Sequence, residues 1–394
     1  MLILTEHAIV NACRYREDDL SEAMGVREVG YFDNIGGGQI TVENGFAYIG
    51  HMKAPDGTSI VDVRDPKNPK LAATVQIPAH IHSHKVRVGN GLMLVNHEIM
   101  SDTIDPNACS GGGLGIYDNT NPFQPKLIHE WEAPGKGVHR FDFDGRYFYG
   151  SATQAGYHGT IVMILDLIDP AKPREVGRWH MPGQWLAGGE KPTWGAIDDH
   201  RCHHPLRFGD RLFTSYWHGG FVILDISDMS NPKYISGLNW SPPFACPTHS
   251  AVLVPFPLHG RRVMLVADED VAKIGSGPPA FLWLVDITDE TRPIPFSSFQ
   301  LDHLGDKEAP PMTGCHQTVE KIASTEVPVA WFANGLRIVD ISKPHAPKEV
   351  AHYLPDVPQG SRRVSSNDVF VDDRGLIYLL DRVRGLHILE RVKD

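Results

Sequence analysis

The sequence predicts an all-β fold, and more narrowly a seven-bladed β-propeller, from three observations. A short apolar strand motif that ends in Asp recurs along the chain, a turn containing Pro follows most of its copies, and segments typical of helices are sparse. The 38 Gly and 30 Pro residues suit the many tight turns that such a fold requires. Repeats of about fifty residues, each with four short strands, are typical of propeller blades.

The clearest repeated element reads small residue, three or four apolar residues, then Asp. Its copies lie at 57–62, 113–118, 160–166, 220–225, 281–286 and 335–340, and a seventh at 385–390 has Glu in the last position. The turn that follows, for example 65–69, contains Pro and Asn, which favour tight turns. We expect the repeated Asp to cap this turn by accepting hydrogen bonds from backbone N–H groups.

Each repeat is predicted to contain three further strands: one that begins near a histidine, one that precedes the Asp-bearing strand, and one that follows the turn. The last repeat lacks its final strand, and residues 26–32 resemble the final strands at 174–179 and 348–353. We therefore expect a single domain over residues 1–394, with residues 26–33 as the closing strand of the seventh blade. Closure of this kind removes exposed strand edges.

Composition limits the partners and the compartment. The net charge of −11, with no basic cluster, argues against nucleic acid as a partner. No apolar run approaches the roughly 20 residues that span a bilayer, so we expect no membrane partner. Residues 1–25 are expected to form an N-terminal extension without a secretory signal, in which 9–24 is the only helix candidate. The five cysteines lack framework spacing, which predicts a cytoplasmic protein, while the sequence does not indicate an oligomeric state.

In five repeats a histidine stands two residues before the first apolar strand. A residue that recurs at one position of a repeat recurs at one place in a ring, so we expect five imidazoles to converge on the axis. They are His84, His139, His204, His249 and His316. Neutral imidazole is the commonest metal ligand, and because three or four ligands suffice, which of the five bind an ion stays open. Gly38 and Asn367 occupy this position in the first and seventh repeats and leave an open coordination position.

A second set of polar residues follows the second strand of each repeat, which ends on the same face. Glu269 and His218 are predicted to be catalytic as an acid/base pair, Glu269 because it stands in an acidic run at 268–270. Trp194 and Trp217 are expected to form an aromatic wall for a small-to-medium organic substrate. The full set predicted to contact substrate or support the metal ligands is His51, His97, His203, Trp194, Trp217, Asn367 and Arg382.

The strand motif resembles that of a known family. The segments Ile60-Val61-Asp62 and Ile338-Val339-Asp340, each followed by a Pro turn, resemble the LVIVD-repeat propeller proteins, from about residue 26 to residue 392. The segment 214–225 is also similar to a blade of the selenium-binding protein/methanethiol oxidase group, whose members are propellers with a histidine-bound copper. The first resemblance implies the fold, and the second implies a histidine-bound metal without indicating a substrate.

Together these features predict a metal-dependent enzyme, in first place an oxidoreductase that uses O₂ at a non-haem Fe or Cu ion, with Zn or Mn as alternative ions. A metal-dependent hydrolase or lactonase, or a lyase, is the alternative enzyme class, in which the metal polarises a carbonyl and activates water. A non-catalytic binding propeller is the alternative outside enzymes, and it predicts that no metal is bound.

Overall fold

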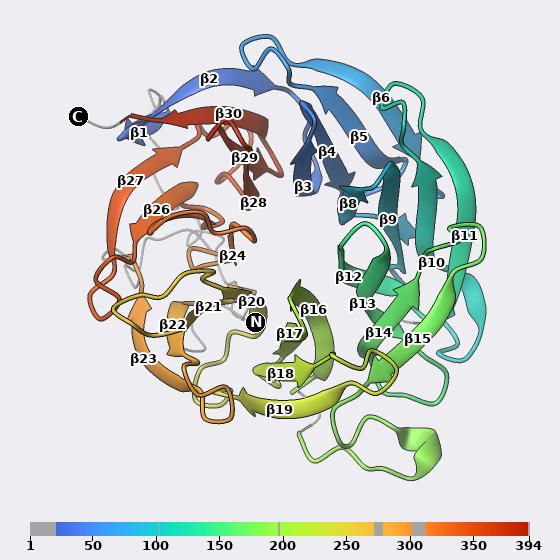
Figure 1. Cartoon of the computed structure of the whole chain (residues 1–394). Coiled ribbons are helices and arrows are strands. Elements are labelled where there is room, and N and C mark those ends of the chain that lie inside the picture. Colours follow the sequence, from blue (N-terminus) through green and yellow to red (C-terminus); the bar gives the residue numbers. More distant parts are fainter. Residues whose placement is uncertain (1–20, 102, 196–197, 272–278, 302–311, 393–394) are drawn as a thin grey trace, which may run out of the picture.

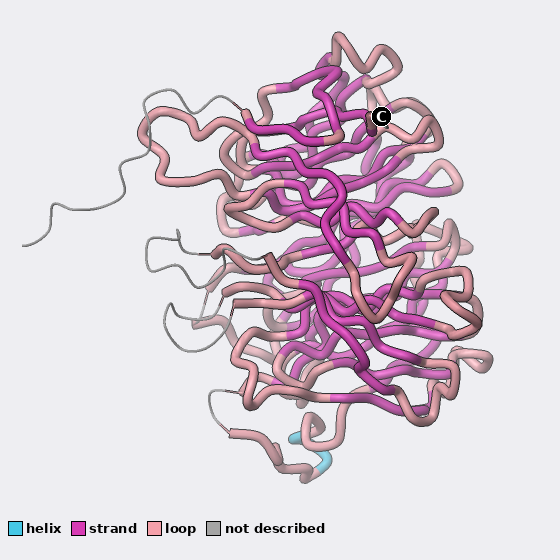
Figure 2. Tube along the Cα trace, turned by 90° about the vertical axis from the view of Figure 1, so that its left-hand side faces the viewer, coloured by secondary structure: helices cyan, strands magenta, loops and turns pink. Residues whose placement is uncertain are grey.

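The computed structural model describes residues 21–101, 103–195, 198–271, 279–301 and 312–392. Over these ranges the protein is almost entirely β-structure, and its antiparallel sheets follow one another in a ring around a central axis (Figure 1). Seen edge-on, the strands occupy the middle of the ring and the connections project from its two faces (Figure 2). The described residues include one short helix, η1 (Leu186–Gly188), and no helix there has the length and apolar character needed to cross a bilayer.

The first three sheets are separate and antiparallel. The first consists of β3 (Gly37–Glu43), β4 (Phe46–His51), β5 (Asp56–Asp62) and β6 (Lys70–Gln76). The second consists of β7 (Ile81–His82), β8 (Val86–Gly89), β9 (Leu92–Ile99), β10 (Cys109–Asp118) and β11 (Lys126–Pro134). The third consists of β12 (Val138–Phe143), β13 (Tyr147–Thr153), β14 (Thr160–Asp166) and β15 (Arg174–Trp179).

An eight-stranded sheet comes next and has two halves that are joined by the single residue pair Trp217 and Thr248. Its first half consists of β16 (His200–Phe208), β17 (Arg211–Trp217), β18 (Phe221–Asp225) and β19 (Lys233–Leu238). Its second half consists of β20 (Thr248–Leu253), β21 (Val263–Asp268), β22 (Leu282–Asp286) and β23 (Ile294–Phe299).

The last two sheets bring the two ends of the chain together. One consists of β24 (Gln317–Thr318), β25 (Glu326–Ala330), β26 (Leu336–Asp340), β27 (Lys348–Leu354) and the N-terminal β1 (Glu22–Met24). The other consists of β28 (Ser366–Val371), β29 (Ile377–Asp381), β30 (Gly385–Arg391) and the N-terminal β2 (Val26–Phe32).

The pairing predicted for residues 26–32 is confirmed, because β2 lies antiparallel to β30 with Val26 opposite Arg391 and Phe32 opposite Leu386. The helix candidate at 9–24 is wrong at its end, where residues 22–24 form β1 and pair with β27. These residues are held by pairing with β27, and local helix propensity does not decide their conformation. Residues 9–20 lie outside the described part of the chain.

The repeated Asp caps the turn that follows it, as predicted. In six copies a side-chain oxygen of the Asp accepts a hydrogen bond from the backbone N–H two residues later, at distances of 2.8–3.1 Å. This local bond stabilises the turn and so fixes where the next strand begins. The acceptors are Asp62, Asp118, Asp166, Asp225, Asp286 and Asp340.

The innermost strands are irregular near one end. The register between the innermost strand and its neighbour shifts within β3, β12, β16, β20 and β28, in each case at the residues predicted to face the axis. A bulge inserts an extra residue and redirects side chains. The apolar core lies between neighbouring sheets, where for example Tyr149 and Ile164 pack with Tyr216 and Leu224. The core therefore holds the sheets in place while the bulges present polar residues to the axis.

Candidate metal centre

The hydrogen-bond register identifies the residue that stands at the histidine position of each innermost strand. In β9 the residue opposite the repeated Asp118 is Leu92, and Val95 lies three residues further on. Val95 pairs with Val86 of β8, which stands two residues after His84. In β17 the residue opposite the repeated Asp225 is Arg211, and Thr214 lies three residues further on. Thr214 pairs with Pro205 of β16. The residue two positions before Pro205 is His203. His203 is therefore the residue of β16 that corresponds to the repeated histidine.

The repeat position assigned to His204 from the sequence is wrong by one residue. Pro205 stands where the other repeats have an apolar strand residue, so counting back two residues from Leu206 ends at His204 instead of His203. Neighbouring residues of a strand point in opposite directions, so the two histidines enter different environments.

Six imidazole rings form a continuous chain around this end of the axis. Their ring centroids are separated by 4.4, 4.8, 4.8, 4.7 and 4.2 Å along the chain. Five of the residues are buried, and the side chain of His139 is 16% exposed. The rings belong, in order, to His82, His84, His139, His203, His249 and His316. The predicted convergence is thus confirmed for four of the five histidines, with His203 in the place given to His204.

Four of the six rings have one nitrogen committed to an oxygen atom. Because carbonyl and carboxylate oxygens accept, each Nδ1 carries the hydrogen and each Nε2 keeps a lone pair. Such oxygen partners orient metal-binding imidazoles in known metal sites. The four bonds join His82 Nδ1 to the Met52 carbonyl (2.8 Å), His139 Nδ1 to Glu98 Oε2 (2.7 Å), His203 Nδ1 to the His249 carbonyl (2.8 Å) and His316 Nδ1 to the Asn367 carbonyl (2.5 Å).

Two of the free lone pairs face each other. The Nε2 atoms of His139 and His203 lie 3.0 Å apart, although both rings use Nδ1 as their donor. Two lone pairs at this distance repel unless a proton or a cation lies between or beside them. Two nitrogens bound to one ion at about 2.0–2.1 Å would lie about 2.9–3.4 Å apart for bond angles between octahedral and tetrahedral. The observed separation matches that of two ligands on one metal ion.

The remaining two rings, His84 and His249, have no hydrogen-bond partner at either nitrogen. Burial holds the pKa of His84, His203, His249 and His316 well below its usual range, and nearby positive charge, including that of the buried Arg140, acts in the same direction. Burial also lowers the pKa of His139 to about 4. These five imidazoles are therefore neutral at neutral pH, which is the form that binds metals.

Two glutamates lie within this chain of rings. Glu98, on β9, accepts the hydrogen bond of His139, and although burial alone would raise its pKa, His139 lowers it to about 2. Glu269 follows β21 and lies with Oε1 3.6 Å from His316 Nε2 and Oε2 3.9 Å from His249 Nε2. Burial raises the pKa of Glu269, against the opposing effect of Arg140.

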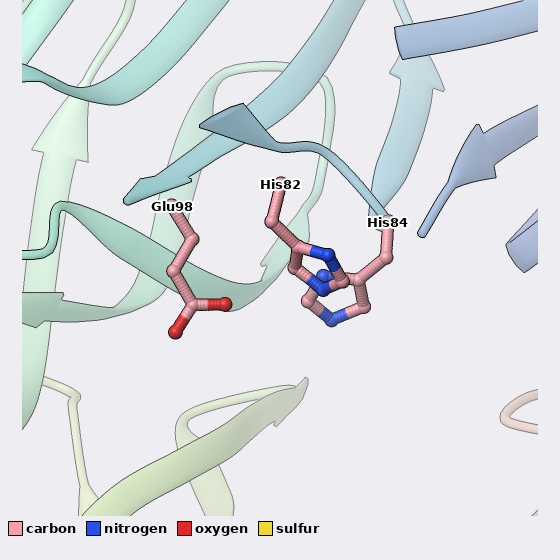
Figure 3. Close-up of side chains that lie close together, drawn as sticks. All are labelled: His82, His84 and Glu98. Atoms are coloured by element: carbon pink, nitrogen blue, oxygen red, sulfur yellow. The ribbon is translucent and has the colours of Figure 1, made fainter. Parts of the chain in front are cut away.

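The side chains make two groups whose potential ligand atoms lie within 4.8 Å of one another. Each group contains two imidazoles and one carboxylate. We call His203, His249 and Glu269 the first cluster, and His82, His84 and Glu98 the second cluster. Figure 3 shows the second cluster, with both rings and the carboxylate directed toward one another.

His204 belongs to a separate polar layer deeper in the channel. Its Nε2 lies 3.3 Å from Lys85 Nζ and 3.6 Å from Glu320 Oε1. In the same layer, Gln317 accepts hydrogen bonds from Arg140 (2.9 Å) and from Gln39 (2.8 Å), which reach it from other sheets. These bonds cross the channel between separate sheets and form a polar layer beside the histidine chain.

The other predicted histidines lie apart from this chain. His218 accepts a hydrogen bond from the backbone N–H of Asp199 (3.2 Å), and the described contacts do not link it to either cluster. His51 is bonded to Ser59 (2.8 Å) within its own sheet. Burial lowers the pKa of His97 to about 4, and its ring packs against the neighbouring strand β10. The predicted common cavity of His218 and Glu269 is therefore not supported by their contacts.

Of four further predicted residues, three border the histidine chain and one does not. The ring of Trp217 lies 4.7 Å from that of His203, and the Asn367 carbonyl holds His316. Arg382 stands over Phe332, the ring that packs against His316 at 4.3 Å. Trp194 stacks on His200 at 4.6 Å in the outer connection and makes no described contact with the histidine chain. Trp217, Asn367 and Arg382 thus border the centre, whereas Trp194 does not.

Two members of the second cluster were missed as ligands by the sequence reasoning. His82 stands next to the repeated position, and Glu98 stands next to the predicted His97. A signal for Glu98 exists in the repeat itself. In each repeat we count from the residue that pairs with the repeated Asp, taken as the first. The seventh residue is then Glu98 in β9, Trp217 in β17 and Glu269 directly after β21. All three border the histidine chain, so the seventh position faces the axis.

Comparisons with known proteins agree with the fold. The LVIVD repeat matches residues 37–76, 209–238 and 328–354. No curated protein sequence matches the chain. Among solved structures, the β-propeller domain of Myceliophteria thermophila Cps50 (Swd1) is similar with a TM-score of 0.58 and 13% identity, over 93% of this chain and 100% of that one. Saccharomyces cerevisiae Sqt1 is similar with a TM-score of 0.55 and 11% identity, over 92% and 88%.

The computationally designed Ika8 protein is also similar, with a TM-score of 0.53 and 5% identity over 93% of this chain and 99% of that one. Likeness at these identities concerns the fold alone, because one fold hosts many unrelated functions. The chain therefore contains LVIVD repeats and has β-propeller structures as neighbours.

Proposed function

We propose that this protein is a metal-dependent oxidoreductase that uses O₂ to oxidise a small-to-medium organic molecule at an Fe or Cu ion on the axis. One observation carries the proposal: in a chain of six imidazoles, His139 and His203 each donate Nδ1–H to an oxygen, and their Nε2 atoms face each other at 3.0 Å. Two imidazoles with one carboxylate are typical of non-haem Fe(II) oxygenases, and imidazole also suits Cu, with Zn as a further candidate.

We infer that the sheets are the seven blades of one propeller, with β3, β8, β12, β16, β20, β24 and β28 as their inner strands. The single pair that joins the halves of the eight-stranded sheet supports this count, because each half has four strands like its neighbours. The likeness of segment 214–225 to a blade of the selenium-binding protein/methanethiol oxidase group supports Cu as a candidate ion. In such a ring, separate blades deliver their ligands to one point on the axis.

The roles of individual residues follow from their positions. His203, His249 and Glu269 would bind the ion, with His139 and His316 beside them. A bound Fe or Cu ion would supply one-electron chemistry and O₂ activation at this point. Burial, together with the positive charge of Arg140, keeps His249 unprotonated, and Trp217 lies beside His203. Glu269, whose pKa is raised by burial, is suited either to bind the ion or to carry a proton.

The test begins with the metal content of the full-length protein. We expect purified wild type to contain Fe or Cu, and the double variant His249→Ala/His316→Ala to lose the ion bound at the first cluster, because two adjacent imidazoles are removed. The variant His129→Ala serves as the matched control, since His129 lies in the outer strand β11. Oxygen uptake is then measured with a panel of organic substrates for wild type and both variants.

The outcomes separate the alternatives. Absence of metal from wild type, also after loading with Fe²⁺ or Cu²⁺, would reject the enzyme proposal and favour a binding propeller. Metal without oxygen uptake, but with cleavage of esters or lactones, would make the protein a metal-dependent hydrolase, and elimination products would make it a lyase. The variant Glu269→Gln then assigns that residue: lost metal indicates a ligand, whereas lost turnover with metal retained indicates a proton carrier.

A further inference from the structure

We propose that the second cluster, formed by His82, His84 and Glu98, binds a second metal ion next to the first, so that the centre is binuclear. This inference rests on the proposed function only in placing the first ion at His203, His249 and Glu269. It assigns a role to residues that the single-ion proposal leaves without one.

The unpaired ring nitrogens of His84 are the first observation that supports a second ion. His84 is 2% exposed, and neither of its ring nitrogens has a hydrogen-bond partner. Leaving buried polar atoms unpaired is costly, and buried polar groups in native proteins are nearly always satisfied. Its two nitrogens are too deeply buried to be satisfied by bulk water. A cation bound at His84 would satisfy one of them directly.

The second argument is the orientation of the partner groups. His82 donates Nδ1–H to the Met52 carbonyl (2.8 Å), so its Nε2 lone pair is free, and its ring lies 4.4 Å from that of His84. Glu98 reaches the same space from β9, and Figure 3 shows its carboxylate directed toward the two rings. Two imidazoles and a carboxylate suit Fe, Zn, Mn or Cu, whereas Mg and Ca prefer oxygen ligands alone.

The third argument is the connection between the two clusters. Glu98 Oε2 accepts from His139 Nδ1 (2.7 Å), and His139 Nε2 lies 3.0 Å from His203 Nε2 of the first cluster. A carboxylate of the second cluster therefore orients an imidazole that borders the first. Occupation of one cluster would fix the position of Glu98 and His139 for the other, so we expect the two ions to bind with positive cooperativity.

A simpler arrangement makes the same bond to His139. In it, Glu98 only orients His139 toward a single ion, and His82 and His84 bind nothing. The two arrangements differ in stoichiometry. The experiment therefore strips the full-length protein with a chelator, reloads it separately with Zn²⁺ and Fe²⁺, and measures bound metal per chain by elemental mass spectrometry.

We expect two ions per chain in wild type and in the His129→Ala control, and one ion in each of the double variants His82→Ala/His84→Ala and His249→Ala/His316→Ala. One ion in wild type that survives His82→Ala/His84→Ala would overturn the second site and leave the proposed function standing. One ion in wild type that both double variants remove would also overturn it, because a single shared site would then explain the data. No ion in any protein would overturn both proposals.

Anomalous scattering at the zinc edge from crystals of zinc-loaded wild type gives a measurement that does not depend on the folding of a variant. Two peaks, one at each cluster, are expected. A single peak, or a second peak away from His82, His84 and Glu98, would overturn the inference.

Discussion

Individual hydrogen bonds fix the orientation of the residues that border this centre. Asp268 is an example, because it is fully buried beside Glu269 and accepts hydrogen bonds from the indole N–H groups of Trp240 (3.1 Å) and Trp283 (2.6 Å) and from Thr248 (3.1 Å). Burial raises the pKa of Asp268 to about 8, and the three donors act in the opposite direction. The side chain thereby anchors the end of β21, after which Glu269 turns toward the axis.

Replacing Asp268 by Ala should destabilise the protein by at least about 3 kcal/mol, because each buried donor left without an acceptor costs about 1–3 kcal/mol. The free energy of unfolding, measured by urea titration, checks this. Asp373→Ala, at an exposed turn position, is the matched control and should change stability by less than about 0.5 kcal/mol. Equal stability of the two variants would show that the indoles find other partners.

Successive side chains of a strand point to opposite faces, and this explains which single site residues the sequence could reveal. The four convergent histidines were found because they recur at a fixed distance from an apolar strand. The sequence predicts His97 at the centre, whereas the structure places Glu98 there, because the sixth residue of the strand faces the neighbouring strand and the seventh faces the axis. The displacement at His204 has a similar origin, since Pro205 takes the place of an apolar residue. These choices depend on register, which the pattern of residue types fixes only to within one position.

Strands, in contrast, follow from the sequence, because apolar runs, the repeated Asp and the Pro turns together mark where each begins and ends. The closing strand β2 also has a polar attachment. Glu28 accepts hydrogen bonds from Tyr353 Oη (2.5 Å) on β27 and from His387 Nδ1 (2.6 Å) on β30. Burial would raise the pKa of Glu28, but these hydrogen bonds outweigh it, so the pKa is lowered from its usual value of 4.5.

This shift predicts a pH dependence of stability. Because the pKa of Glu28 is lower in the folded than in the unfolded state, its contribution is present above about pH 4.5 and is lost as the pH falls further. The variant Glu28→Gln should therefore be less stable than wild type at pH 7, and the difference should shrink as the pH falls below about 4.5. Thermal unfolding across this range checks it, with Glu22→Gln, a more exposed partner of His352, as the control. A constant difference would exclude the carboxylate as its source.

The strand as a whole should matter more than this one side chain. A chain that starts at Gly36 lacks β2 and leaves the edge of β30 open, whereas a chain that starts at Ser21 keeps both N-terminal strands. We expect the shorter chain to lose at least about 3 kcal/mol relative to the longer one, since the six residue pairs of β2 with β30 and the three of β1 with β27 are removed and each hydrogen bond contributes about 0.5–1.5 kcal/mol. Equal melting temperatures for the two chains would contradict this role of β2.

The whole molecule is held in a ring by packing between sheets, and the histidine chain adds a second connection at the axis. Its six rings come from five successive parts of the ring of sheets. An ion bound to several of them would add a further connection to the apolar packing and to the polar bonds that cross the channel. A ligand that binds only the folded state stabilises it by mass action.

We therefore expect metal to raise the melting temperature of the chelator-treated protein by roughly 3 °C when Zn²⁺ or Fe²⁺ is present at about 100 times its dissociation constant, which corresponds to about 2.7 kcal/mol. Differential scanning fluorimetry measures this shift. His249→Ala/His316→Ala should show a much smaller rise than His129→Ala. An identical rise in both variants would place the stabilising ion elsewhere.

The pairing of β2 with β30 also sets an order of events while the chain is being made. Arg27 and Glu390, which form an ion pair across these strands, are 363 residues apart in the sequence. At a synthesis rate of roughly 5–20 residues per second, β2 waits for its partner for about 20–70 seconds after it leaves the ribosome. Every residue of the histidine chain, the last being His316, is synthesised during this interval. The nascent protein can therefore gather its imidazoles before the ring shuts, and during that time the unpaired β2 is open to binding by chaperones.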